Sequence, residues 1–202
     1  MSEVQVASIV EGQGDREAVP VLVRRIARDI DPGFVPRLLE PLRVPADKLR
    51  KEGEVERAVE WAARKLGGCG GILVITDCDW DGGCPARDGP LLLARACRTR
   101  PDIAISVILA KKEFEAWFLA AAESLRGKRG LSEELFGPAD CEAVRGTKEW
   151  LTRHMPEGRP YSATVDQPAL TAVFDMDMGR RRSDSFDKCY RDIKRMLETL
   201  MR

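Results

Sequence analysis

The stretch Ile72-Leu73-Val74-Ile75-Thr76-Asp77-Cys78-Asp79-Trp80-Asp81-Gly82-Gly83 decides how the rest of the sequence is interpreted. It begins with four apolar, mostly β-branched residues, and two glycines end it. A short apolar run bounded by turn residues predicts a buried strand of a parallel sheet. In open α/β sheets ligands bind outside the carboxyl ends of the strands, where Asp77, Asp79 and Asp81 are expected. Three carboxylates this close together repel one another unless a cation or water stabilises them, so the stretch predicts a divalent-metal site at a strand tip.

On both sides of this stretch the sequence alternates between strand and helix patterns. Strands are predicted over 4–10 and 103–109, with a weaker, proline-interrupted candidate for a sheet edge over 34–39. Apolar residues at helical spacing predict helices over 16–30, 54–66, 89–98 and 111–126. This order predicts an α/β fold with a mostly parallel, Rossmann-like sheet and helices on both faces.

The last third of the chain has a different pattern. A polar loop is predicted over 127–139, and helices over 141–154, 167–178 and 185–201. We therefore expect a core over 1–126 and a helical C-terminal extension over 127–202 that packs on the core, without requiring the extension to be an independent domain.

Composition limits the classes of function. The 33 basic and 33 acidic residues balance, so the chain as a whole is not drawn to nucleic acid or to a membrane, and a polyanion would have to be held locally. The six cysteines form no close pair and there is one histidine, which argues against structural zinc. With no signal-peptide pattern and no apolar run near 18 residues, we expect reduced thiols in a cytoplasmic protein.

Glu11 follows the first predicted strand as Asp77 follows the third. If those strands are neighbours, Glu11, Asp77 and Asp79 converge, as carboxylates do in magnesium sites for phosphoryl transfer. Gly12 and Gly14 permit a tight turn and close backbone approach, so they are candidates for contact with a phosphate. The segment has neither a Walker A pattern nor GxGxxG, and Glu11 is alternatively an ordinary turn residue.

The aspartate-rich turn has two other interpretations. Asp77, Asp79, Asp81 and Gly82 occupy positions 1, 3, 5 and 6 of an EF-hand calcium loop, and Asp88 falls at position 12. A strand rather than a helix precedes it, however, and position 12 is normally glutamate. The other interpretation is a solvated acidic turn.

Two further groups of residues are candidates. Glu115 lies between apolar residues of a predicted helix, and we favour it over Glu113 as a carboxylate directed at the strand tips; both also suit the first turn of a helix. The basic segment 179–188 includes Arg181, Arg182 and Ser185 and precedes a predicted helix start, which suits a phosphate, although such runs are commonly solvated surface.

The order of these motifs resembles a known domain. Ile9-Val10-Glu11-Gly12 followed by Asp77-x-Asp79 resembles the Toprim domain of topoisomerases, bacterial primases and overcoming-lysogenization-defect (OLD) nucleases. The chain is also similar to a bacterial Toprim-like family of unknown function, which is related to the OLD-type Toprim. The motifs that carry this similarity are, in order, VEGxGD, DxD with a DxxCP-like loop, ExW after the fourth strand, and Ser185-Phe186. The resemblance covers about residues 4–126, and Ser185-Phe186 extends it.

The resemblance implies a metal-dependent nuclease that uses Mg²⁺ or Mn²⁺. Glu11 matches the family's general acid/base or metal ligand, and Asp77 and Asp79 match its DxD ligands. Asp81 and Glu115 are implied as carboxylates of a second metal or its surroundings. Lys188, or an arginine from 180–182, would then neutralise charge in the transition state.

The resemblance also implies a setting in genome maintenance or phage defence. Expected partners are nucleic acid, DNA rather than RNA, and a separate ATPase, because the chain has no Walker motif; a homodimer is left open and no membrane is expected. The alternative is a non-catalytic Toprim-like module that binds nucleic acid or a partner protein, which the balanced charge favours. A phosphatase of another DxD fold, with Asp77 as covalent nucleophile, is a third interpretation.

Overall fold

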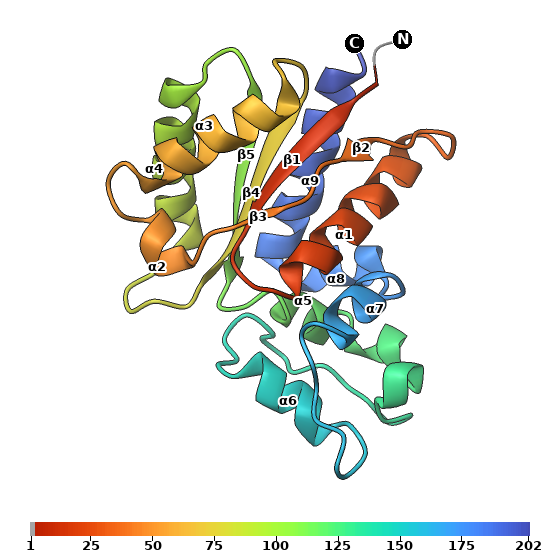
Figure 1. Cartoon of the computed structure of the whole chain (residues 1–202). Helices are drawn as coiled ribbons and strands as arrows, with labels where there is room; N and C mark the ends of the chain where they lie inside the picture. Colours follow the sequence, from red (N-terminus) through yellow and green to blue (C-terminus); the bar gives the residue numbers. More distant parts are fainter. Residues whose placement is uncertain (1–2) are drawn as a thin grey trace.

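The computed structural model describes residues 3–202 and shows an α/β fold built on a five-stranded sheet (Figure 1). The strand order is β2-β1-β4-β5, with β3 beside β1, and every pairing between these strands is parallel. The strands are β1 (Gln5–Val10), β2 (Arg37–Leu38), β3 (Leu42–Arg43), β4 (Gly71–Cys78) and β5 (Ala104–Lys111). The predicted parallel α/β sheet is confirmed.

Helices cover both faces of the sheet, with α3 and α4 on one face and α1 and α9 on the other (Figure 1). The helices are α1 (Asp15–Ile30), α2 (Ala46–Leu49), α3 (Glu54–Leu66), α4 (Pro85–Thr99), α5 (Ala116–Ala120), α6 (Thr147–Arg153), α7 (Asp166–Thr171), α8 (Met176–Arg182) and α9 (Asp184–Leu200). Two short 3₁₀ helices, η1 (Ala122–Leu125) and η2 (Lys128–Gly130), follow α5. Over residues 3–202, no helix combines the length and apolarity needed to cross a bilayer.

Alternate residues of the strands supply two hydrophobic cores. Leu73 and Ile108 pack in the cluster that contains α1 and α9, whereas Val74 and Val107 pack in the cluster with α3 and α4. Because both faces of β4 are covered, its residues 71–76 are all buried, and this is why the sequence shows a continuous apolar run there rather than an alternating pattern.

Several predicted elements were wrong in extent. The edge strand over 34–39 is reduced to the two residues of β2, and β3 and α2 follow where only a loop was expected. The predicted helix 167–178 is two helices, because Asp175 caps α8 by accepting a hydrogen bond from the Met178 amide (2.9 Å). The predicted helix 141–154 forms only in its second half, as α6.

The predicted continuous helix over 111–126 was also wrong. Lys111 belongs to β5, and Lys112 has a φ of 70°, in the left-handed region, and bridges to Cys78. The amide of Phe114 donates to the Asp77 carboxylate (2.9 Å). The backbone over 112–115 therefore contacts the end of β4, and helical structure begins only at Ala116.

The C-terminal part completes the core that the first 126 residues begin. Phe186, Ile193 and Leu197 of α9 belong to the same hydrophobic cluster as Val6 and Leu73 of the sheet. Residues on both sides of position 126 thus belong to one hydrophobic cluster.

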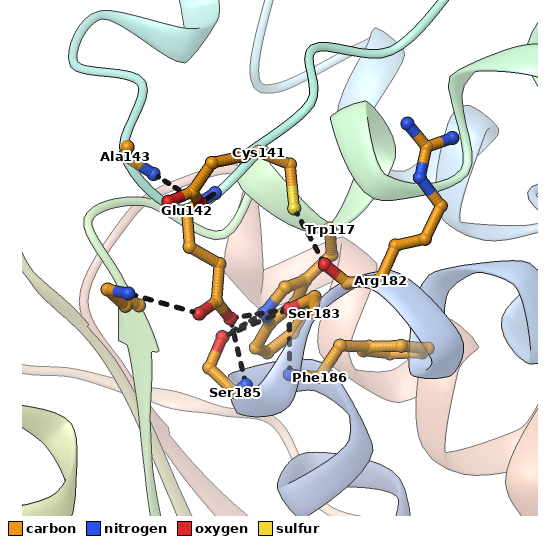
Figure 2. A network of polar contacts seen from close by, with 10 residues as sticks. Trp117, Cys141, Glu142, Ala143, Arg182, Ser183, Ser185 and Phe186 are labelled. Atoms are coloured by element: carbon orange, nitrogen blue, oxygen red, sulfur yellow. Dashed lines mark hydrogen bonds and ion pairs between the residues drawn. The ribbon is translucent and has the colours of Figure 1, made fainter.

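A buried polar network fixes the start of α9 (Figure 2). Glu142 accepts hydrogen bonds from the Ser183 hydroxyl (2.6 Å) and the Ser185 amide (2.8 Å). The Ser185 hydroxyl accepts from the indole N–H of Trp117 (2.9 Å), and Ser183 accepts from the Phe186 amide (3.1 Å). The network ties the loop at 142, helix α5 and helix α9 together, so these serines have a structural role.

Candidate functional site

Glu11 and Asp77 meet at the carboxyl ends of β1 and β4. The register pairs Val10 with Ile75, so Glu11 comes to lie beside the next residues of β4. Its Oε2 accepts hydrogen bonds from the Thr76 hydroxyl (2.8 Å) and from the Asp77 amide (3.0 Å). Parallel neighbouring strands end at the same sheet edge, which is why two residues 66 positions apart share one site.

The Asp77 carboxyl group lies in a strongly acidic environment. Burial raises its pKa well above the ordinary value, and the nearby carboxylates of Asp15, Glu115 and Glu11 raise it further, against the opposing charge of Lys148. Its Oδ1 accepts from the Phe114 amide. Negative charge on this group is therefore costly unless a cation approaches.

A cavity of about 320 Å³ opens next to these two carboxylates. Its lining residues are Glu11, Ala46, Asp47, Arg50, Asp77, Asp79, Trp80 and Glu113. Asp79 is partly exposed at the rim, with Oδ1 3.7 Å from the Lys112 ammonium. The cavity therefore presents mainly carboxylate oxygens, together with one guanidinium and one indole.

These oxygens are the donor type that Mg²⁺ and Mn²⁺ prefer. Within residues 3–202, no three His, Cys, Asp or Glu side chains stand close enough together to hold a metal ion. Asp79 faces Lys112 rather than Asp77. The donor chemistry fits a hard divalent cation, but ligation would require Asp79, which already lines the cavity, to exchange its contact with Lys112 for one with the cation.

Glu115 is not among the lining residues of this cavity and is almost fully buried, with 1% of its surface exposed. It accepts a hydrogen bond from the Tyr161 hydroxyl (3.1 Å), and its other oxygen is 3.6 Å from the Lys148 ammonium. Burial raises the pKa of Glu115 to about 7, although Lys148 opposes the shift. Burial, followed by the charge of Glu115, also raises the pKa of Tyr161.

Lys148, from α6, is a component of the site that sequence reasoning missed. Its ammonium lies 3.6 Å from Glu115 and 3.9 Å from Glu113, and the Thr147 hydroxyl donates to Glu113. Burial lowers the pKa of Lys148, but the surrounding carboxylates outweigh burial and the net shift is upward. Neither Lys148 nor Tyr161 stands in a motif, so no sequence signal marked them.

The glycine-containing loop after β1 is used for packing. The Gly12 amide donates to Asp15 (2.7 Å), and Asp15 in turn accepts from the Gln167 side chain (2.6 Å). A Cβ on Gly14 would stand 2.0 Å from Gln167 Oε1 and 2.4 Å from the Ala163 carbonyl oxygen. The expected phosphate contact at Gly12 and Gly14 is thus replaced by contacts within the protein, because Asp15 already holds the Gly12 amide.

The structure does not bring Asp81 to the Glu11 cavity. Its side chain is fully exposed, and its nearest ionic partner is Arg145 at 3.9 Å. Asp88, position 12 of the hypothetical calcium loop, instead accepts from the Cys84 amide (2.9 Å) and pairs with Arg87. Asp77 contacts the Phe114 amide, whereas Asp88 contacts Cys84 and Arg87, so the two do not face one shared ion site, which argues against the EF-hand interpretation.

The basic segment also lies elsewhere. Lys188 donates to the Val107 carbonyl (3.4 Å) and pairs with Asp192, on the α9 side of β5. Arg181 is exposed, and Arg182 pairs with Glu123 (2.7 Å). Ser185 is buried in the network of Figure 2. The predicted phosphate contacts of these residues and the predicted role of Lys188 have no counterpart at the Glu11 cavity.

The cysteines and the single histidine are the remaining residues of a kind that can bind a metal. All six cysteines are free thiols, as expected. His154 stacks on Trp150 (ring centroids 4.0 Å apart) and its Nδ1 lies 2.8 Å from the Trp150 carbonyl oxygen, which is a structural environment.

Comparison with protein-family models, with curated proteins and with solved structures finds no match to this chain.

Proposed function

We propose that this chain is a metal-dependent phosphodiester hydrolase, a nuclease of the Toprim type. The observation that carries the proposal is the contact between Glu11 and Asp77 at the ends of adjacent parallel strands, beside a cavity lined by further carboxylates. The motif resemblance extends this proposal: the substrate would be DNA, a separate ATPase would be the partner, and the setting would be genome maintenance or phage defence.

The residues that would hold Mg²⁺ or Mn²⁺ are Glu11, Asp77 and Asp79. The raised pKa of Asp77 supports this assignment, since neighbouring negative charge destabilises its ionised form and a cation would relieve that repulsion. When bound, the cation supplies neutralisation of the charge that develops on the phosphodiester.

Glu11 is suited to activate the attacking water. The Thr76 hydroxyl and the Asp77 amide fix Oε2, and its Oε1 has no hydrogen-bond partner among residues 3–202. A carboxylate with one oxygen anchored and one facing a cavity can accept a proton in a defined direction. In this proposal Glu11 removes the proton of the water, and Asp77 would hold the cation.

In this proposal Lys148, rather than Lys188, neutralises charge in the transition state. It is held between Glu113 and Glu115, and Glu113 lines the cavity. Its positive charge lowers the cost of bringing a phosphate next to several carboxylates. Glu115 and Tyr161 act through Lys148, because Glu115 is buried, does not line the cavity and contacts the Lys148 ammonium.

The test is nicking of supercoiled plasmid DNA in Mg²⁺ or Mn²⁺. Removal of a general base or of a metal ligand costs roughly 100-fold or more, so Glu11→Gln and Asp77→Asn should each lose activity by at least that factor. Asp81→Asn, whose side chain lies outside the cavity, should retain it. Wild-type protein that leaves DNA and RNA intact, alone and with an ATPase partner, would contradict the proposal.

One observation favours the second candidate, a non-catalytic module. Lys112 faces Asp79 and Lys148 faces Glu113 and Glu115, so lysines already neutralise part of the acidic cluster without a metal. A module of this kind binds nucleic acid or a partner protein equally well in EDTA and cleaves nothing, which the same assay distinguishes.

A further inference from the structure

A second cavity, of about 390 Å³, lies beside the carboxylate cavity. The two cavities share Arg50 and Trp80 as lining residues. Leu91 and Leu92 of α4 add apolar surface to the second cavity, and Leu91 is 60% exposed. A half-buried indole, an exposed leucine and a guanidinium thus stand next to the proposed site of phosphodiester cleavage.

The guanidinium group of Arg50 forms no ion pair with a carboxylate among residues 3–202. Its guanidinium carbon lies 4.3 Å above the centre of the Trp80 ring, and among residues 3–202 no acidic side chain comes within ion-pair distance of it. Its pairing with the ring is a cation–π contact that leaves its N–H groups available to a phosphate.

The protein holds this pair in place from both sides. Arg95 binds Glu56 through two hydrogen bonds (2.7 and 2.8 Å) and donates to the carbonyls of Arg50 (3.1 Å) and Lys51 (2.7 Å). Under the indole, a Cβ on Gly83 would stand 2.9 Å from Trp80 Nε1, so the absence of a side chain lets the ring lie there. The pair is therefore positioned before any ligand arrives.

The other charged groups of this cavity are engaged or turned outward. Arg87 pairs with Asp88 (2.7 Å) and also donates to the Gly82 carbonyl (2.7 Å). Asp81 is fully exposed beside Arg145. Arg50 is thus the cation of this cavity that remains for a ligand.

We infer that the second cavity takes one unpaired base of a single nucleic-acid strand, with its phosphate at Arg50. Arg50 covers one face of the Trp80 ring, so the base would stack on the guanidinium plane that the ring supports, and the N–H edge of the guanidinium would bind the phosphate. A base within a duplex is already stacked and cannot enter such a cavity. The shared wall would place the neighbouring phosphodiester at Glu11 and Asp77. The inference rests on the proposed function and names its substrate class, single-stranded rather than duplex nucleic acid.

The test measures binding in EDTA, so that it does not depend on cleavage. A mixed-sequence 12-nucleotide DNA strand is titrated against the full chain, with tryptophan fluorescence and the polarisation of a labelled strand as readouts. Trp61 of α3 is a matched control, because it also forms a cation–π contact, with the Lys65 ammonium 4.0 Å from the ring centre, and it lines neither cavity. Trp61→Phe and Trp80→Phe therefore remove the same kind of residue from two different places.

We expect the DNA strand to quench the tryptophan fluorescence of wild type and of Trp61→Phe alike, and to quench that of Trp80→Phe much less. Loss of one stacking or phosphate contact should raise the Kd roughly tenfold in Trp80→Ala and in Arg50→Gln. The duplex of the same sequence should bind more weakly than the single strand. Equal Kd values for wild type, Trp80→Ala and Arg50→Gln, or duplex binding as tight as single-strand binding, would overturn the inference. Failure to cleave the same single strand in Mg²⁺ or Mn²⁺, with this binding intact, would overturn the nuclease proposal instead.

Discussion

Glu115 is a carboxyl group buried beside a lysine and a tyrosine. Lys148 favours its ionised form, yet burial prevails and its pKa is raised from 4.5 to about 7. Such a group exchanges its proton near neutral pH, and each exchange changes the charge that Lys148 faces.

This shift predicts a pH dependence of stability. Between about pH 4.5 and 7 the folded protein holds a proton on Glu115 that the unfolded chain releases, so the free energy of unfolding falls as pH rises through this window. The loss should be on the order of 3 kcal/mol in wild type relative to Glu115→Gln. Urea unfolding in EDTA at pH 5 and pH 8 measures it; parallel pH profiles for the two proteins would contradict the shift.

The proximity of Glu11 and Asp77 could be predicted from the sequence because both directly follow apolar strands that pair with each other. Sequence reasoning could not find Lys148 or Tyr161, which approach Glu115 from 33 and 46 residues away through α6 and irregular segments. Contacts of this kind depend on how loops pack, and no local pattern encodes them.

At the scale of elements, the turn between β1 and α1 is packed against the segment that leads into α7. Asp15 accepts from Gln167, and Gly14 lies directly against Ala163 and Gln167. The start of α1 and the start of α7 therefore hold each other in position behind the carboxylate cavity.

Gly14→Ala should separate these two elements. The added Cβ would overlap backbone as well as side chain, so we expect a loss of about 1–3 kcal/mol in the free energy of unfolding by urea denaturation. Gly33→Ala, beyond the other end of α1, is the control, since its Cβ meets only Asp31 Oδ1 at 3.4 Å. Equal stability of the two variants would show that the Gly14 contact is unimportant.

The elements themselves were predictable where one apolar face dominates. The predictions for α1, α3, α9 and β1 agree with the structure to within a few residues because each buries a regular stripe or run. The helix predicted over 111–126 failed because Asp77 binds the Phe114 amide and Lys112 adopts a left-handed conformation. Tertiary contacts at the site override the helical pattern there.

At the scale of the whole molecule, residues 3–126 and 127–202 share one core. Helix α9 covers β4 and β5, and Phe186 and Ile193 are fully buried in that core. A chain ending at residue 126 would expose the apolar face formed by Leu73 and Ile108.

We therefore expect residues 1–126 expressed alone to lack a cooperative unfolding transition, and the full chain to unfold in one. Far-ultraviolet circular dichroism and tryptophan fluorescence, followed together during urea denaturation, should give coincident curves for the full chain. A separate, cooperative transition for the fragment would show instead that residue 126 ends an independent domain.

The proposed function requires Glu11 and Asp77 to form one cation-binding site at the strand ends, and electron paramagnetic resonance of bound Mn²⁺ measures that binding. We expect wild type and Asp81→Asn to bind Mn²⁺ alike, and Glu11→Gln and Asp77→Asn each to bind it roughly tenfold or more weakly. Equal binding by all four proteins, or no binding by wild type, would rule this site out.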